Sequence, residues 1–503
     1  MKNIKNIVLS LLAIGFFACE NETLDDLRNR ANPDEEVLPD LTSGDADFSN
    51  YVAIGNSLTI GYTDNSVFKA TQTNSYPNIL AGQFTAVGGG EFVQAMTADN
   101  YGGLSVGGNR IADPRLVFNG AGPASLESVI GPVTVGTDLL DNPTGPFNNL
   151  GVPGARSFHL LAQGYGNLNN LALGLANPYA VRLTGSTPNA SIMELAVAQS
   201  PSFVSLWIGA NDVLSYSTSG GSNGALTPQA TFDASMDAIA ASLSTTGAQG
   251  VMANIPYVTD IPFFTTVPHN PIPLDAANAA AVNSGYAAYN QALAATQGPN
   301  IPQNPLYGAL TAEEAAARTI TFGVGQNAVV IEDESLTDLS IFGLPNFRQA
   351  TENDLVVILA ASFIGTLADP NNPASVNGIG VPLADNWVLT ETEVNEIKSA
   401  TDLINVKISS IASDLGYAYF DANDFFRRIF NGDITYNSFN PNASLVFGGM
   451  ISLDGVHPTS RGYAIIANEF MKAIDNQYGS NFEASGNLVN IGDYPTNYSP
   501  FLQ

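Results

Sequence analysis

Short apolar runs of strand length alternate with longer runs of helical spacing, and this alternation restricts the possible folds more than any other feature. Residues 51–54, 201–208 and 251–256 have the composition of buried strands. Residues 231–246 and 391–414 carry apolar side chains at the three- and four-residue spacing of amphipathic helices. Such alternation predicts a parallel sheet with helices on both faces, and therefore an α/β fold.

Polar residues and glycines follow two of these predicted strands. The first strand runs into Gly55, Asn56 and Ser57, and the second runs into Gly209, Ala210, Asn211 and Asp212. A serine that opens a helix just after a strand can meet backbone N–H groups and the positive end of the helix dipole. This is a suitable position for a nucleophile and for stabilising an oxyanion. The elbow of α/β-hydrolases requires a glycine two residues after the serine, where this chain has Thr59, so that fold is not indicated.

Two further segments carry candidate site residues. Asn149 to Ser157 places Gly151 and Gly154 in a turn between the first two strands, and Leu453 to Thr459 contains Asp454 and His457. Because His457 follows Asp454 by three residues on one loop, the carboxylate can hold the Nδ1–H and direct Nε2 toward a serine. We interpret the other two histidines, His159 and His269, as structural or loop residues.

In order along the chain, these segments supply Ser, Gly, Asn and Asp-x-x-His, a pattern that resembles the SGNH (GDSL-type) hydrolase superfamily. The resemblance implies a flavodoxin-like three-layer α/β/α sandwich with a parallel sheet. We predict no cofactor and no metal at its site. The resemblance also implies Ser57 as nucleophile, His457 as general base and Asp454 as the residue that orients the base. The implied oxyanion hole combines the backbone N–H groups of Ser57 and Gly154 with the side-chain amide of Asn211.

Three positions qualify this resemblance. Gly151 is the alternative to Gly154 in the oxyanion hole. Asp212 is interpreted as structural. Asn56 stands where the family has an aspartate, and we expect it to have no catalytic role because an amide cannot carry the charge.

The N-terminus resembles that of a bacterial lipoprotein. Lys2 and Lys5 precede an apolar run of about a dozen residues that is too short to span a bilayer. The predicted signal peptide, residues 1–18, ends before Cys19, the only cysteine and the predicted site of lipidation. The alternative is a plain secretory signal followed by an unused cysteine.

We predict an acidic flexible tether over residues 19–47. It resembles the surface-export signal of Bacteroidetes lipoproteins, which implies an anchor at the outer membrane, on the periplasmic side or exposed at the surface. The predicted hydrolase domain spans residues 48–480, and residues 481–503 form a C-terminal tail. The chain exceeds a compact member of the family mainly at residues 86–147 and 262–390, which we expect to form a cap or subdomain near the site.

The net charge of −29, with only 17 Lys and Arg residues, argues against nucleic-acid binding. Three histidines and one cysteine leave little for a transition-metal site, whereas a carboxylate-bound ion stays open. The predicted protein is a monomeric serine ester hydrolase acting on a small-molecule, glycan or lipid ester. The alternatives are an acyltransferase, a non-catalytic binding lipoprotein on the same scaffold, and a glycosidase using two carboxylates.

Overall fold

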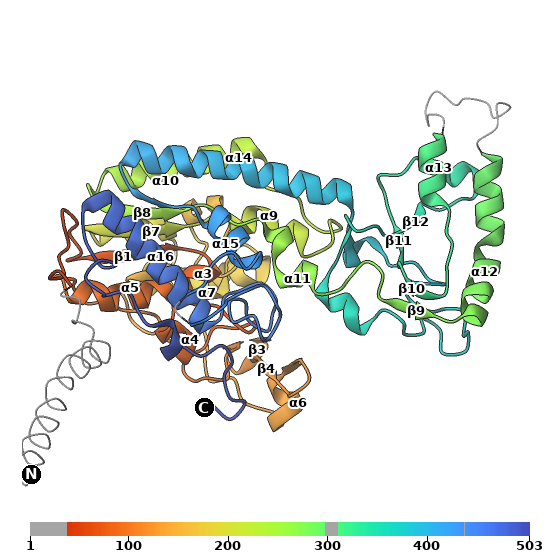
Figure 1. Ribbon diagram of the computed structural model, residues 1–503. Helices are drawn as coiled ribbons and strands as arrows, with labels where there is room; N and C mark the ends of the chain where they lie inside the picture. Colours follow the sequence, from red (N-terminus) through yellow and green to blue (C-terminus); the bar gives the residue numbers. More distant parts are fainter. Residues whose placement is uncertain (1–37, 297–309, 437) are drawn as a thin grey trace, which may run out of the picture.

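The computed structural model describes residues 38–296, 310–436 and 438–503, so the predicted signal peptide and Cys19 lie outside the described residues. A five-stranded parallel sheet forms its centre (Figure 1). The strands are β1 (Tyr51–Gly55), β6 (Asn149–Gly151), β7 (Phe203–Trp207), β8 (Gln249–Ala253) and β15 (Ala418–Phe420). Their order, β15-β8-β7-β1-β6, is that of flavodoxin-like folds and confirms the predicted fold class.

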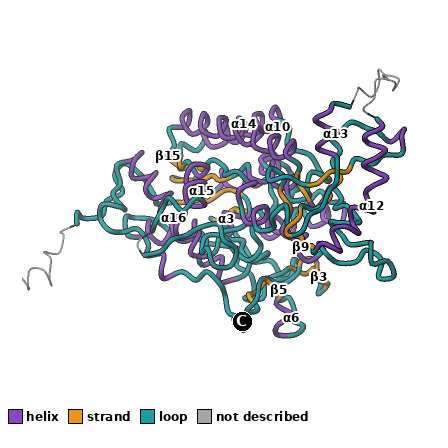
Figure 2. Tube along the Cα trace, turned by 45° about the vertical axis from the view of Figure 1, so that its right-hand side comes forward, coloured by secondary structure: helices purple, strands orange, loops and turns teal. Residues whose placement is uncertain are grey.

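Strand alternation divides the core into two layers. Val52 and Ile54 of β1 face a cluster completed by α8 (Ile192–Ala198), α10 (Gln229–Ser244) and α14 (Glu391–Leu415). Tyr51 and Ala53 face the opposite cluster, completed by α5 (Tyr76–Thr85), α15 (Ala422–Phe430) and α16 (Ser460–Tyr478). In Figure 2, α10 and α14 run along one side of the central strands. The predicted helices over 231–246 and 391–414 are therefore present with bounds shifted by one or two residues.

Caps explain where the two longest body helices begin and end. Thr390 and Glu393 form a capping box at the start of α14, and Gly416 ends the helix in the left-handed conformation. Thr459 caps α16 by accepting the N–H of Gly462, and Gly479 ends that helix in the same way. No helix within the described residues is long and apolar enough to cross a membrane.

The first insertion, residues 86–147, consists mainly of loops with two small antiparallel pairs and one short helix. Its elements are β2 (Leu104–Val106), β3 (Asn109–Ala112), β4 (Leu116–Phe118), β5 (Pro123–Ser125) and α6 (Leu126–Ile130). The remaining short helices of the body are α3 (Ser57–Ile60), α4 (Lys69–Thr73), α7 (Pro178–Thr184) and α9 (Ala210–Ser217).

The second insertion forms a lobe beside the body, seen on the right of Figure 1. It leaves the body after α11 (Pro262–Thr265) and returns at β14 (Val388–Leu389). We call residues 268–387 the lobe. Its elements are β9 (Ile272–Leu274), α12 (Ala276–Ala295), α13 (Ala312–Arg318), β10 (Gly325–Asn327), β11 (Val330–Glu332), β12 (Phe347–Gln349) and β13 (Leu355–Val356).

The end of the predicted tether is not free. The N–H of Thr42 donates to Asn481 and that of Asp47 donates to the side chain of Gln249. Ala46 is buried beside β7 and α16. The tether expectation over 19–47 is therefore wrong for residues 42–47, because their backbone hydrogen bonds and the buried side chain of Ala46 attach them to the body.

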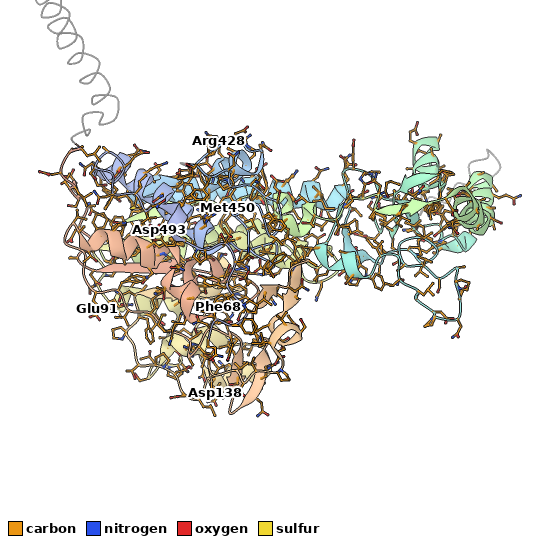
Figure 3. The ribbon with its side chains drawn as sticks, turned by 60° about the horizontal axis from the view of Figure 1, so that its bottom comes forward. Phe68, Glu91, Asp138, Arg428, Met450 and Asp493 are labelled. Atoms are coloured by element: carbon orange, nitrogen blue, oxygen red, sulfur yellow. The ribbon has the colours of Figure 1, made fainter. Side chains whose placement is uncertain are left out.

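The C-terminal tail also packs on the body. Phe482 and Ile491 are buried against α16, and the buried Arg115 donates to the carbonyl of Ser499 at 2.7 Å. Of the residues labelled in Figure 3, Phe68 and Met450 are buried, and Glu91, Arg428 and Asp493 are exposed.

Candidate active site

Ser57 lies at the start of α3, directly after β1. Asn56 caps the helix by accepting the N–H of Leu58 at 3.0 Å, so its amide has a structural role. Gly55 is required where the strand passes into the helix, because a Cβ there would come within 2.4 Å of both Thr59 Oγ1 and the Trp207 carbonyl. The backbone N–H of Ser57 finds no acceptor among the described residues, which leaves it free for a ligand.

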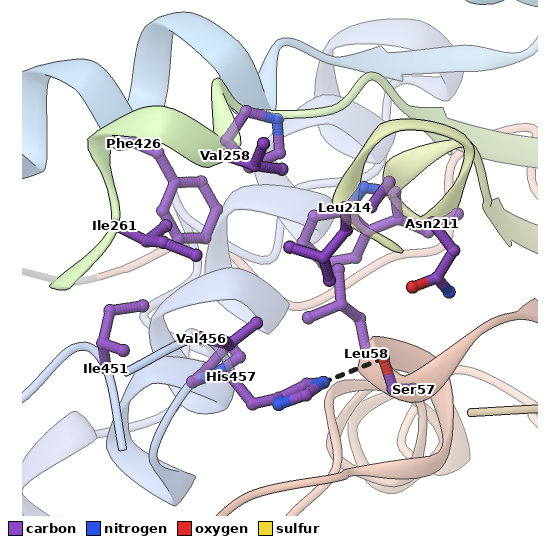
Figure 4. Close-up of a pocket in the computed structure, with 14 residues that line it drawn as sticks. Ser57, Leu58, Asn211, Leu214, Val258, Ile261, Phe426, Ile451, Val456 and His457 are labelled. Carbon is purple, nitrogen blue, oxygen red and sulfur yellow. Dashed lines mark hydrogen bonds between the residues drawn. The ribbon is translucent and has the colours of Figure 1, made fainter. Parts of the chain in front are cut away.

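His457 and Asp454 form a hydrogen-bonded chain with Ser57 (Figure 4). The distance from His457 Nε2 to Ser57 Oγ is 3.0 Å, and that from His457 Nδ1 to Asp454 Oδ2 is 2.8 Å. The loop that carries the pair precedes α16 and reaches Ser57 across 400 residues of sequence. The three side chains therefore have the geometry in which a base accepts the serine proton while a carboxylate orients the base.

Asp454 is held as a carboxylate. Burial alone would raise its pKa, but the attraction of His457 and the N–H groups of Val456 and His457 together lower the pKa of Asp454 to about 2. Both of those backbone N–H groups donate to Oδ1 at 2.9 Å. An ionised Asp454 can stabilise a positive charge on the imidazole throughout the neutral pH range.

Asn211 points its side-chain amide toward Ser57 from the first turn of α9 (Figure 4). One N–H of the amide donates to the carbonyl of Ala155 at 2.9 Å, and the other finds no acceptor among the described residues. This bond joins Asn211 to the residue that follows Gly154. Gly154 has a φ of +77°, which favours glycine, and its N–H likewise finds no acceptor within the described part of the chain.

Gly151 serves a different purpose. A Cβ at Gly151 would come within 2.4 Å of the Ile60 backbone nitrogen, so the glycine lets β6 lie against α3. Its own N–H already donates to the side chain of Asn149. Of the two candidates, Gly154 is thus the one with a free donor.

Asp212 and His159 hold the surrounding loops. Asp212 accepts the N–H and the hydroxyl of Ser157 at 2.9 and 2.8 Å, which ties the loop of Gly154 to α9. His159 Nδ1 accepts the N–H of Arg156, and its ring stacks on Tyr165. Burial, with the charge of Arg156, lowers the pKa of His159 to about 4, so this histidine is neutral at pH 7.

An apolar pocket opens beside Ser57 and His457, with Phe426 on the side away from Ser57 (Figure 4). Besides Ser57, Asn211 and His457, its lining consists of Leu58, Trp207, Ala210, Leu214, Pro256, Val258, Ile261, Phe426, Ile451, Val456 and Pro458. Most of these lining residues could not be predicted from the sequence. The only available signal was the strongly amphipathic pattern of residues 422–430, which could have predicted α15 but not the direction in which Phe426 points.

Within the described residues, neither insertion supplies a lining residue to this pocket. Of the two expected forms, a cap or a subdomain near the site, the described residues form no cap that lines this pocket, and the second insertion forms the lobe. The base of the second insertion does reach the site loop, since the N–H of Phe263 in α11 donates to the carbonyl of Gly455 at 2.9 Å.

One group of carboxylates could hold a metal ion. Glu334, Asp385 and Glu393 place one oxygen each within 4.8 Å of one another, where the lobe meets α14. None of the three lines the pocket beside Ser57, and we assign them no part in its chemistry.

Comparisons with known proteins place these residues in a family context. A family model described as GDSL-like Lipase/Acylhydrolase matches residues 51–470. No curated protein matches the chain.

Several solved structures are similar at low identity. An acetyl-xylooligosaccharide esterase mutant from Geobacillus Stearmophilus is 11% identical, with a TM-score of 0.32 over 86% of this chain and 96% of that one. An alpha/beta hydrolase enzyme from the metagenome of Lake Arreo is 12% identical, with a TM-score of 0.31 over 88% and 98%. An extracellular lipase from Streptomyces rimosus is 12% identical, with a TM-score of 0.28 over 86% and 99%. At these TM-scores and identities, the similarities carry no argument about substrate.

Proposed function

Because the chain belongs to the GDSL-like lipase/acylhydrolase family, we propose that it hydrolyses carboxylic esters with Ser57 as nucleophile. The observation that carries this proposal is the continuous chain of hydrogen bonds from Ser57 through His457 to Asp454. His457 takes the proton of Ser57 as Oγ attacks the ester carbonyl, and the carbonyl oxygen becomes an oxyanion.

The remaining steps follow from the same groups. The N–H groups of Ser57 and Gly154 and the free N–H of Asn211 donate to the oxyanion. The protonated His457 gives its proton to the departing alkoxide, which leaves an acyl group on Ser57. Water then attacks the acyl-enzyme with His457 as base, and the carboxylic acid departs as Oγ recovers its proton.

The pocket supports an ester with an apolar acyl group. Among the described residues that line it, most side chains beside Ser57 are aliphatic or aromatic, the polar ones are Ser57, Asn211 and His457, and the indole N–H of Trp207 donates to the carbonyl of Asn254. Burying an alkyl chain against such walls contributes roughly 0.8 kcal/mol per methylene group. A polar acyl group would lose hydrogen bonds to water there without replacing them.

We further propose that the protein is lipid-anchored through Cys19 at the outer membrane. The support is in the sequence alone: two lysines, a short apolar run, one cysteine and an acidic segment after it. Replacing Cys19 with Ser in the full chain should move the protein from the membrane fraction to the soluble fraction and abolish radiolabelling by palmitate. Membrane retention of the variant would contradict the anchor.

Hydrolysis of p-nitrophenyl esters from acetate to palmitate by residues 20–503 tests the catalytic proposal. Ser57→Ala is the blank, because it keeps the pocket and removes the nucleophile. We expect the activity to fall by at least about 10³-fold in the blank. Equal activity in both proteins would overturn the role of Ser57. Faster transfer of the acyl group to an added alcohol than to water would identify an acyltransferase with the same acyl-enzyme.

A further inference from the structure

A two-residue turn immediately after the helix of Ser57 reaches the loop that carries Asp454 and His457. Thr63 and Ser66 exchange two backbone hydrogen bonds, of 3.0 and 2.9 Å, around Asp64 and Asn65. The two central residues have φ values of 50° and 62°, a conformation that Asp and Asn tolerate better than most residues. The turn thus directs two consecutive N–H groups toward one target.

That target is the carboxylate of Asp454. The N–H of Asn65 donates to its Oδ2 at 3.0 Å. The N–H of Asp64 donates to Ser452 Oγ at 3.0 Å, and the hydroxyl of Ser452 donates in turn to Asp454 Oδ1 at 3.0 Å. The turn therefore reaches both oxygens of the carboxylate, one directly and one through Ser452.

The side chain of Asp64 closes the contact from the other direction. Its Oδ1 accepts the N–H of Leu453 at 3.1 Å, and the residue is only 1% exposed. Burial raises the pKa of Asp64 to about 7, Asp454 adds to this effect, and the Leu453 bond and Arg115 oppose it. The catalytic steps above leave this buried carboxyl group without a role.

Neighbouring contacts support the same loop. The hydroxyl of Thr63 donates to the Pro458 carbonyl at 2.6 Å, and the Tyr62 ring lies 4.5 Å from the His457 ring. The segment from Ser57 to Asn65 is short and largely buried. The nucleophile and the support of its base are therefore parts of one compact segment.

We propose that Asp64 is a positioning residue that holds Asp454, and through it His457, at the distance from Ser57 that proton transfer requires. The proposal rests on the catalytic roles proposed above. Asp64 touches no reacting atom. Its carboxyl fixes the 452–454 backbone, so that the donors from Asn65 and Ser452 meet both oxygens of Asp454.

The test compares Asp64→Ala with Asp64→Asn in steady-state ester hydrolysis. Alanine removes the acceptor of the Leu453 N–H, and we expect kcat to fall about 10- to 100-fold because a small displacement of a catalytic group is costly. KM should stay within about twofold, because no pocket residue changes. Asparagine keeps an acceptor and tolerates the positive φ, so it should recover kcat to within about threefold of the wild type.

Two further variants separate positioning from general destabilisation. Asp475→Ala removes a carboxylate that accepts the N–H groups of Phe482 and Glu483 at the far end of α16. It should lower Tm and leave kcat unchanged. Ser452→Ala removes only a hydroxyl and should lower kcat about 3- to 10-fold, so it tests the relay even where Asp64→Ala does not fold.

A readout independent of activity distinguishes the two proposals. The chain has three histidines, so the Nδ1–H resonance of His457 can be followed in histidine-labelled protein. It should shift in Asp64→Ala, return in Asp64→Asn and stay unchanged in Asp475→Ala. If the spectra change as expected but the wild type hydrolyses no ester, the catalytic proposal is overturned and the positioning of His457 by Asp64 is not. Wild-type kcat in Asp64→Ala, or an unshifted resonance, would overturn the role of Asp64.

Discussion

At the scale of single residues, the site depends on the charge of Asp454 as much as on its position. An amide in its place would have nearly the same shape, but it could turn its NH₂ toward His457 Nδ1 and favour the wrong tautomer. Since the pKa of Asp454 is held at about 2, the wild-type carboxylate keeps its charge across the range in which most enzymes are assayed.

We therefore expect Asp454→Asn to lower kcat by roughly 10⁴-fold at pH 7 and above. The folded state should persist, since an amide can still accept the N–H groups of Val456 and His457. The matched control is Asp475→Asn, which should leave kcat unchanged. A kcat within tenfold of the wild type in Asp454→Asn would contradict the proposed role of the carboxylate.

The residues at the strand ends could be singled out from the sequence because each lies in a short polar segment that interrupts an apolar pattern. The structure brings Ser57 and Asn211 to one edge of the sheet because each follows a parallel strand, and the loop before α16 carries Asp454 and His457 to the same place. Asp64 carried no such signal. Its burial and its contact with Leu453 arise only when residues almost 400 positions apart meet.

At the scale of elements, α15 supplies a pocket wall. Phe425 and Phe426 are neighbours on this helix and both are buried, at 6% and 4% exposure. Only Phe426 lines the pocket, whereas Phe425 packs on Phe420. The pair thus offers two similar substitutions of which one alone changes the pocket.

We expect Phe426→Leu to raise kcat/KM for octanoyl relative to acetyl p-nitrophenyl esters by about tenfold, because a shorter side chain leaves room for a longer acyl chain. Phe425→Leu should lower the stability by a similar amount to Phe426→Leu, but it should keep the wild-type ratio of kcat/KM for octanoyl over acetyl esters. An unchanged ratio in Phe426→Leu would mean that the acyl chain does not reach α15.

A second element-scale prediction concerns the first turn of α14. Glu393 completes the capping box there, and its side chain is buried beside Glu334 and Asp385. Burial raises the pKa of Glu393 to about 7, and the charges of its neighbours add to the effect. The folded protein therefore binds more protons than the unfolded chain between about pH 4.5 and 7, so stability falls as pH rises through this window.

Glu393→Gln should remove this loss of stability with rising pH. It should keep the capping box, since glutamine at this position also completes a capping box. Relative to the wild type, the free energy of unfolding of Glu393→Gln should be nearly unchanged at pH 4.5 and higher by about 1–3 kcal/mol above pH 7. Urea unfolding at both pH values measures it. Glu194→Gln is the control. Glu194 completes the capping box of α8 on the exposed surface, where the Ser191 N–H lowers its pKa, so its replacement should not stabilise.

Long elements were predictable from the sequence and the smallest were not. The helices of residues 276–295 and 391–415 have enough turns to show composition or periodicity. The paired strands of the insertions have only two to four residues each, too few for a period of two to appear. Their pairing depends on contacts that no local pattern records.

At the scale of the whole molecule, the lobe stands apart from the chemistry. Its two ends lie close together, because Val356 pairs with Val267 on one side and with Val388 on the other. Two strand spacings separate Val267 from Val388, roughly 10 Å. No described residue of the lobe lines the pocket, and Phe263, whose N–H donates to the carbonyl of Gly455, lies outside the lobe.

A linker of about six residues can span this distance, so residues 268–387 can be removed without stretching the body. We expect the shortened protein to keep kcat/KM for a short p-nitrophenyl ester within about threefold, because the sheet, the site loop and α11 stay in place. Its Tm should fall, because apolar side chains at the start of α14 lose their cover. The same deletion with Ser57→Ala supplies the blank. A folded deletion protein with a hundredfold lower kcat would show that the lobe acts on the site through α11, whereas unchanged activity on short esters would direct the search for its role to larger natural substrates.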